Sequence, residues 1–473
     1  MKKSVCIVGV GPHAKRIYFK YFVDYKLNPA LVVELVSKEQ ETREFLKSKG
    51  IENYEMMLLE DGFKDDVLLN EDFAKKLQEK CKELKITHAI ISTEPKAHNA
   101  YVNFFLDNKI PVLSDKPITV RKDMLKKSAI KSIKQDYDTI VKKSVESNTM
   151  VQIMCQRLYH QGYNYIKDLV KKTIKQYNVP VTFCEVYHCD GKWMMPHDLE
   201  CENHPYKYGY GKLYHSGYHF IQLLSEIVSL NKYLKDDSKK LDHVELSSTF
   251  ISPEDELAEI TLNDYKDIFK KQNIPTYYNS PKQNYDKYGE KNNYSLMTFK
   301  NKSGRTITVA ELNLLQNGFS RRGWIQTKED HYKGNGRIRH EYVNIQIGTL
   351  MNIQVHSYQS KEIKDRTDLE TQTGGLEHFD IHIYRNSDLI GGKPYEMISL
   401  KDLYNVKEKN FIGHNEKSRE KFLNDFLAGK TEQGNIKTHS LGIELLYNLS
   451  KLYLGYSKHH KQSSVSFNIA DKV

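Results

Sequence analysis

Residues 5–14 decide the fold, and they read Val5-Cys6-Ile7-Val8-Gly9-Val10-Gly11-Pro12-His13-Ala14. A short apolar run stops at two glycines, and from Lys15 the sequence turns polar with helical spacing, which predicts a strand, a tight turn and a helix. The first glycine allows the sharp turn, the second lets backbone approach a pyrophosphate, and the small third residue lets helix pack on strand. The N–H groups and dipole of the helix would then face the phosphates. We therefore predict that a dinucleotide binds at Gly9, Gly11, Pro12, His13 and Ala14.

A second apolar run, residues 30–36, leads into Ser37 and Lys38. The residue that ends the second strand of a dinucleotide fold selects the cofactor, because an acid there holds the ribose 2′-OH of NAD, whereas a cation accommodates the 2′-phosphate of NADP. A hydroxyl followed by a lysine therefore favours NADP over NAD, and we predict that Ser37 and Lys38 contact the adenosine ribose or its phosphate.

Two more apolar runs, residues 87–91 and 110–113, end in polar residues. Ligands of a parallel sheet lie beyond the carboxyl ends of its strands, so the residues that follow both runs should reach the crevice of the glycine turn. We predict cofactor contacts from Ser92, Thr93, Glu94, Pro95, His98, Asp115 and Lys116.

The alternation of strands and helices stops after the apolar run at 150–155. Most later runs are strand-like, and they predict an open, mainly antiparallel sheet interrupted by a helix at 216–230 and closed by one at 440–452. The fold class we expect is α/β plus α+β. A Rossmann dinucleotide-binding domain would occupy residues 1–155, and a substrate-binding and oligomerisation domain residues 156–473, with insertions near 253–293 and 358–376.

The composition excludes several classes of protein. Hydrophobic residues make up 39% of the 473 residues and charged residues 28%, as in a globular protein. The net charge of +10 comes from lysines interleaved with acids, without the basic stripe and module that nucleic-acid binding requires. We find neither an apolar run of the ~18 residues a membrane span needs nor a secretory signal after Lys2 and Lys3. We therefore expect a cytoplasmic protein that binds a small molecule, not nucleic acid or membrane.

Five motifs occur in the order found in one known family: the glycine turn, Ser92-Thr93-x-Pro95-x-x-His98, Asp115-Lys116-Pro117, Arg157, and Gly209-x-Gly211…His215-x-Gly217-x-His219. Over residues 1 to about 230 the sequence resembles the Gfo/Idh/MocA family of NAD(P)-dependent oxidoreductases. The resemblance implies hydride transfer between nicotinamide and a hydroxyl or ketone carbon of a sugar, cyclitol or sugar-derived substrate, including phosphorylated or nucleotide-linked ones. It also implies a homodimer or homotetramer.

Two positions depart from the family pattern. Asp115 stands where the family usually has Glu, which keeps the carboxylate. His215 stands where the family usually has Asp, four residues before the family's histidine. Residues i and i+4 share a helix face, so His215 and His219 can both point at one substrate, but the charge at the first position is no longer negative. This change puts the usual orienting carboxylate in doubt and points toward an acidic or phosphorylated substrate.

Oxidation of an alcohol needs a group that removes the hydroxyl proton. His219 is our candidate base because imidazole titrates near neutral pH, and Lys116 would hydrogen-bond the reacting oxygen and relay the proton. His215 would orient the substrate or assist the transfer. Further substrate contacts are expected from Arg157, Lys192, Trp193, His197 and Tyr214.

Other interpretations stay open. The residues His188, Cys189, Asp190, His197, Asp198, Cys201 and His204 are of types that suit zinc, but their spacing matches no zinc module, so we expect no metal. The chain could instead be a reductase of a non-sugar intermediate such as an imine, or a cofactor-binding regulator without catalysis. The retained Lys116 and His219 argue against the regulator.

Overall fold

The computed structural model describes residues 3–191, 199–200, 205–271, 284–316, 338–360, 377–407, 411, 413–430 and 433–473. The chain forms two compact units. The first comprises Met1–Lys122, Lys131–His160 and Asn415–Ile443. The second comprises Asp123–Ile130, Gln161–His414 and Glu444–Val473. Each unit is built around its own sheet, one parallel and one mainly antiparallel, which confirms the predicted fold class.

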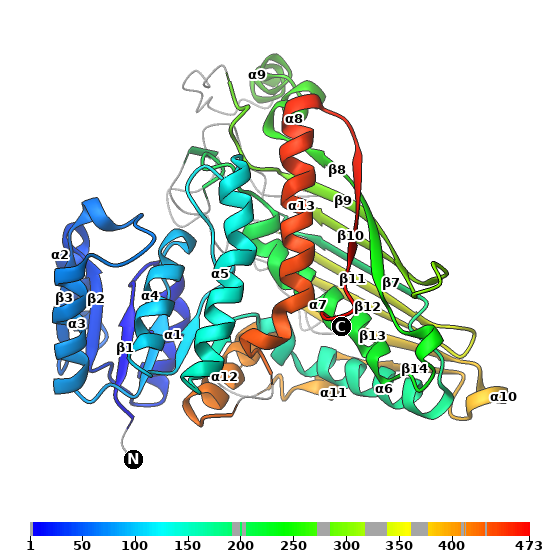
Figure 1. Cartoon of the computed structure of the whole chain (residues 1–473), viewed down its shortest axis with the longest axis horizontal. Helices are drawn as coiled ribbons and strands as arrows, with labels where there is room; N and C mark the ends of the chain where they lie inside the picture. The colour runs from blue at the N-terminus through cyan, green and yellow to red at the C-terminus, as the bar shows by residue number, and fades with distance from the viewer. Residues whose placement is uncertain are drawn as a thin grey trace. The chain divides into compact units, whose positions relative to one another are not determined.

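The first unit holds a six-stranded parallel sheet in the order β3-β2-β1-β4-β5-β6, which is the strand order of the dinucleotide-binding fold (Figure 1). Its strands are β1 (Val5–Val8), β2 (Leu31–Leu35), β3 (Glu55–Leu59), β4 (His88–Ile91), β5 (Val112–Ser114) and β6 (Val151–Ile153). The helices between them are α1 (Pro12–Asp24), α2 (Glu39–Ser48), α3 (Glu71–Glu83), α4 (Pro95–Asp107) and α5 (Lys127–Glu146). The predicted strands are confirmed. Strand β3 lies in a stretch of mixed composition that did not predict a strand.

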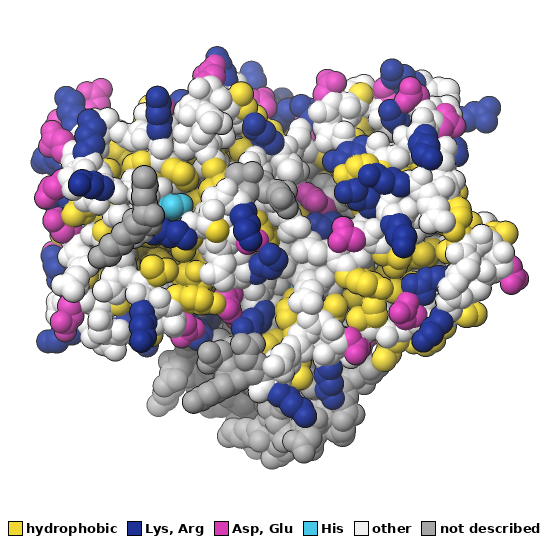
Figure 2. Space-filling model, turned by 90° about the horizontal axis from the view of Figure 1, so that it is seen from below, with side chains coloured by type: hydrophobic (Ala, Val, Ile, Leu, Met, Phe, Trp, Pro, Cys, Tyr) yellow, Lys and Arg dark blue, Asp and Glu magenta, His cyan; other side chains and the backbone are white. Residues whose placement is uncertain are grey.

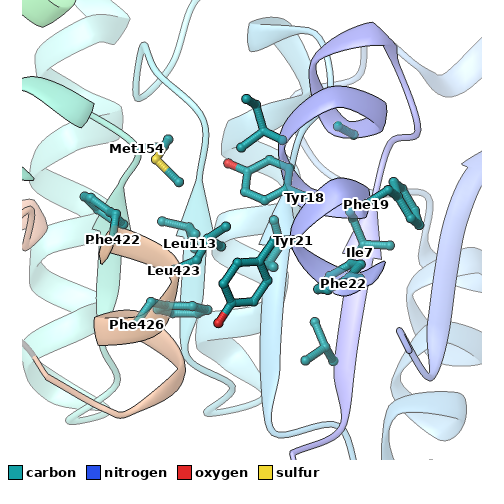
Figure 3. Close-up of a cluster of buried hydrophobic side chains, with 14 of the residues drawn as sticks. Ile7, Tyr18, Phe19, Tyr21, Phe22, Leu113, Met154, Phe422, Leu423 and Phe426 are labelled. Atoms are coloured by element: carbon teal, nitrogen blue, oxygen red, sulfur yellow. The ribbon is translucent and has the colours of Figure 1, made fainter. Parts of the chain in front are cut away.

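A C-terminal segment completes the core of the first unit. Helix α12 (His414–Leu427) contributes Phe422, Leu423 and Phe426 to the same buried cluster as Tyr18 of α1 and Ile7 of β1 (Figure 3). The sequence-based domain limits place this segment in the second domain. Its apolar face instead packs in the first unit, more than 250 residues along the chain from β6.

The second unit is built on a nine-stranded sheet in the order β14-β13-β12-β11-β7-β10-β9-β8-β15. Its strands are β7 (Phe183–Cys189), β8 (His243–Ile251), β9 (Asn292–Lys300), β10 (Thr306–Leu315), β11 (Ile338–Ile347), β12 (Met351–Ser360), β13 (Glu377–Arg385), β14 (Tyr395–Ile398) and β15 (Ser463–Asn468). All neighbouring pairs are antiparallel except β7 and β10. The predicted open, mainly antiparallel sheet is confirmed, and two short strands, β14 and β15, form its edges.

In the described part of the chain, three larger helices lie along one face of this sheet, and four short helices lie in its connections (Figure 1). The larger ones are α6 (Gln161–Tyr177), α7 (Tyr218–Val228) and α13 (Ser440–His459). The shorter ones are α8 (Pro253–Glu259), α9 (Leu262–Lys271), α10 (Ser387–Ile390) and α11 (Leu400–Leu403). Helices α8 and α9 lie within the predicted insertion 253–293. Helix α7 packs on β7 and β10, which places the start of this helix next to the end of β7.

The surface agrees with the interleaved charges of the sequence. On the face shown in Figure 2, lysine and arginine side chains are scattered among acidic ones rather than gathered in one block. Across the described segments, no helix has the length and apolar character that a membrane crossing requires.

Replacement of Phe426 by Ala tests the contribution of α12. The side chain is fully buried, so its removal should lower the free energy of unfolding of the first unit by about 3–5 kcal/mol. Urea unfolding followed by circular dichroism measures the change. Leu389→Ala, at a side chain that is 59% exposed, is the control and should change the free energy by less than about 0.5 kcal/mol. Equal effects of the two variants would contradict the packing.

Candidate functional site

The glycine turn leaves room for a phosphate. Gly9 has a φ of +86°, and a Cβ on it would lie 2.6 Å from the carbonyl oxygen of Ser92, so the turn packs directly on the end of β4. A Cβ on Gly11 would meet no atom within 4 Å, which leaves open space beside the first turn of α1. Ala14 is fully buried. These features fit a dinucleotide pyrophosphate at the N-terminus of α1.

Asp115 joins three predicted segments of the first unit. The Tyr18 hydroxyl donates a hydrogen bond to Asp115 Oδ1 at 2.5 Å, and the Ser92 hydroxyl donates one to Oδ2 at 2.6 Å. His13 Nε2 lies 3.6 Å from Oδ1. The structure thus brings together His13, Ser92 and Asp115, and it places the half-buried Lys116 immediately after them.

Two histidines flank this corner, the partly exposed His13 and the fully buried His98. Burial lowers the pKa of His13 to about 3, with Asp115 opposing the shift and the Arg419 cation of α12 adding to it. His98 Nδ1 lies 2.8 Å from the Pro117 carbonyl oxygen, and burial lowers the pKa of this ring too. His98 therefore ties α4 to the segment that carries Lys116.

The end of β2 differs from the sequence-based interpretation. The strand stops at Leu35, and Glu34 turns its carboxylate to the glycine turn, where Oε2 accepts the Val10 N–H at 2.6 Å. Glu34 comes 20 residues after Ala14, the spacing at which dinucleotide folds place the acid that binds the ribose. This spacing could have revealed Glu34 from the sequence.

Ser37 and Lys38 both contact carboxylates. They lie in a 3-10 turn after β2, where the N–H and hydroxyl of Ser37 donate to Asp61 at 3.0 and 2.5 Å. These hydrogen bonds lower the pKa of Asp61. Lys38 Nζ lies 3.0 Å from Glu41.

The other predicted cofactor residues form the start of α4. Glu94 is its N-cap residue and Pro95 occupies the first turn. The Thr93 hydroxyl donates to the Glu94 carbonyl oxygen at 3.2 Å.

Two of the predicted substrate residues make internal contacts. Arg157 is buried in the first unit, and its Nη1 donates to Asn415 Oδ1 at 2.5 Å. Tyr214, in the second unit, shares a short hydrogen bond with the Ser450 hydroxyl, and burial raises its pKa. Lys192, Trp193 and His197 lie outside the described residues.

His215 and His219 occupy the start of α7, where the chain makes a π-helical turn from Leu213 to Gly217. The Gly217 N–H donates to the Lys212 carbonyl at 2.9 Å, and a Cβ on Gly217 would lie 2.4 Å from that oxygen, so the turn requires glycine. In an α-helix, residues i and i+4 are separated by about 40° around the helix axis. A π turn holds more residues per turn, so this angle is smaller. Both histidines, which are buried, therefore lie on one side of the helix.

A buried acid caps this turn. Glu290 Oε1 accepts the Leu213 N–H at 2.6 Å, and the Glu290 carbonyl accepts the Lys212 N–H at 2.9 Å. Burial raises the pKa of Glu290 to about 7, although hydrogen bonds to its carboxylate oppose the shift. No sequence signal identified this residue.

The described part of the chain brings no three His, Cys, Asp or Glu side chains together as metal ligands. Of the residues considered for zinc, His197, Asp198, Cys201 and His204 lie outside the described segments.

Comparison with known proteins identifies the fold. No family model matches the sequence, and no curated protein matches it. An oxidoreductase from Agrobacterium radiobacter, solved with NAD+, L-tartaric acid and magnesium, is similar with a TM-score of 0.54 at 10% identity, over 100% of both chains. Aldose-aldose oxidoreductase from Caulobacter crescentus, complexed with glycerol, has a TM-score of 0.54 at 10% identity, over 98% of this chain and 100% of that one. UDP-N-acetylglucosamine 3-dehydrogenase from Acidithiobacillus ferrooxidans has a TM-score of 0.51 at 11% identity, over 95% of this chain and 96% of that one.

Glu290→Gln tests the buried carboxylate, because glutamine keeps the oxygen that accepts the Leu213 N–H. The folded-state pKa of about 7 lies above the ordinary value of 4.5, so the folded protein retains this proton to higher pH than the unfolded chain does. The stability of the wild type relative to Glu290→Gln should therefore fall by up to about 3 kcal/mol as the pH rises from 4.5 to 8. Urea unfolding across this range measures the difference, and Glu52→Gln, at an exposed acid, should show no such trend. A pH-independent difference for Glu290→Gln would contradict the assignment.

Proposed function

We propose that this protein is an NAD(P)-dependent oxidoreductase of the Gfo/Idh/MocA type. The observation that carries the proposal is the corner around Asp115. There, a glycine turn with open space at Gly11, the end of β4 and the end of β5 meet beside Lys116. The whole-length fold similarity to oxidoreductases supports it, as does the NAD+ bound in the Agrobacterium radiobacter structure.

The cofactor we propose is NAD. The sequence-based preference for NADP rested on Ser37 and Lys38, whose polar groups contact Asp61 and Glu41. Glu34 adds a third carboxylate next to the glycine turn. Acids at this end of the sheet suit ribose hydroxyls and repel a 2′-phosphate.

The substrate we propose is a sugar, cyclitol or sugar-derived polyol oxidised at one hydroxyl. Bound nicotinamide supplies the hydride acceptor. His219 takes the hydroxyl proton, Lys116 hydrogen-bonds the reacting oxygen, and His215 orients the substrate. The named activities of the Caulobacter crescentus and Acidithiobacillus ferrooxidans enzymes support a sugar-like substrate.

A homodimer or homotetramer, as the family resemblance implies, is also part of the proposal. Exposed apolar side chains at Leu296, Tyr384 and Tyr395, on the face of the second sheet opposite its helices, support this association.

The cofactor proposal predicts that NADH binds at least about 10-fold more tightly than NADPH. Fluorescence titration of the purified protein measures both affinities. Glu34→Gln keeps an acceptor for the Val10 N–H but removes the charge, so it should narrow the ratio several-fold by relieving repulsion of the 2′-phosphate. Tighter binding of NADPH than of NADH by the wild type would restore the NADP interpretation. If the wild type bound neither NADH nor NADPH, the proposed function would be refuted.

Lys116→Met and His219→Gln should each lower kcat by at least about 100-fold, because each removes a group that handles the proton. The affinity for NADH should stay within about threefold for both variants. Turnover is measured with a panel of sugars, polyols, sugar phosphates and nucleotide sugars, and the exposed Lys122→Met and His459→Gln are the controls. Wild-type protein that binds NADH but turns over no alcohol would favour a non-sugar reductase or a regulator.

A further inference from the structure

His188 of β7 and Asp190, which directly follows this strand, contact three residues at and before the start of α7. Lys212 Nζ donates to Asp190 Oδ2 at 2.7 Å and to the Ser216 hydroxyl at 2.8 Å, and it lies 3.0 Å from His188 Nδ1. The Ser216 hydroxyl also donates to Asp190 Oδ2, at 2.5 Å. One turn later, the His188 ring stacks on Phe220 with centroids 4.0 Å apart. We call the group of Lys212, Ser216, Phe220, His188 and Asp190 the β7 clamp.

The clamp is buried and charged. Lys212 is fully buried and the Asp190 side chain is 5% exposed. A buried ion pair adds little stability over apolar residues of the same size, because desolvation offsets the attraction. The pair does fix the relative position of its two side chains, because movement of one partner would leave the other as an uncompensated buried charge.

The clamped residues alternate with the two histidines. Lys212, Ser216 and Phe220 follow one another at intervals of four, and His215 and His219 each precede a clamped residue by one position. The clamp therefore sets the rotation of the helix about its own axis, and with it the direction of both imidazoles. The π turn is the reason why the rotation of the helix needs to be fixed. It contains one residue more than an α-helical turn, and relaxation to α-helix would change the angle between the two histidines.

We propose that Lys212 and Asp190 are positioning residues that hold His215 and His219 in their reactive orientation. This inference rests on the proposed function of His219, but one of its tests does not depend on turnover.

The test uses Asp190→Asn with Lys212→Met in one protein, which removes both charges together. The matched control is Lys167→Met with Glu226→Gln, which removes an ion pair between α6 and the later part of α7. We expect the clamp variant to lose at least 10-fold in kcat for the oxidation, with the KM for NAD+ unchanged within twofold, and the control to keep both values. In 15N-histidine-labelled protein, the ring signals of His215 and His219, assigned with single His→Gln variants, should move in the clamp variant and stay in the control.

A purely structural pair would lower the melting temperature while kcat and both ring signals stayed at wild-type values, and that result would overturn the proposal. If the double variant does not fold, Ser216→Ala, which removes a link to both charged groups, should move the same signals. Unchanged signals in Ser216→Ala would equally overturn it. Absence of wild-type turnover would refute the proposed function, while the histidine signals would still decide whether the clamp orients the helix.

Discussion

The close approach of Gly9 to the Ser92 carbonyl oxygen is the contact on which the first unit depends. No side chain fits at position 9, so the backbone turns sharply between β1 and α1 and lies against the end of β4. The pairing of Ile91 with Ser114 sets Ser92 at the level of Asp115, whose carboxylate accepts hydrogen bonds from α1 and from the end of β4. The steric constraint at Gly9 and the hydrogen bonds of Asp115 together hold the glycine turn, the end of β4 and the end of β5 side by side.

In the second unit, the start of α7 is ordered by a different kind of interaction. Around the start of α7, buried polar side chains act together with close backbone packing: Glu290 caps the π turn and Asp190 binds Lys212. Buried charges are costly unless they are paired, so the pair of Asp190 and Lys212 specifies one arrangement at little gain in stability. The glycine at 217 permits the turn, and the charges select its orientation.

The sequence predicted the parts whose signals are local. The apolar runs of β1, β4 and β5, the glycine turn and the strand-rich second half all have short-range patterns, and the structure confirms them. The sequence could not show where α12 packs, because an amphipathic helix does not reveal which hydrophobic core it will join. Glu290 and the β7 clamp were likewise hidden, since each depends on contacts across 22 or more residues. The apolar run 30–36 extends one residue beyond the end of β2 at Leu35, so the sequence drew attention to Ser37 rather than to Glu34, whose carboxylate accepts the Val10 N–H.

His215 was the position at which the family resemblance was weakest, and the structure changes how that departure is understood. The resemblance places a carboxylate on the helix itself, and here a histidine stands instead. Yet a carboxylate reaches the same turn from β7, because Asp190 bonds to Ser216, the next residue along. Lys212 neutralises that carboxylate, so the region has an acid without a net negative charge. Because the carboxylate and the ammonium are paired, they supply this turn with a fixed geometry rather than with a free negative charge.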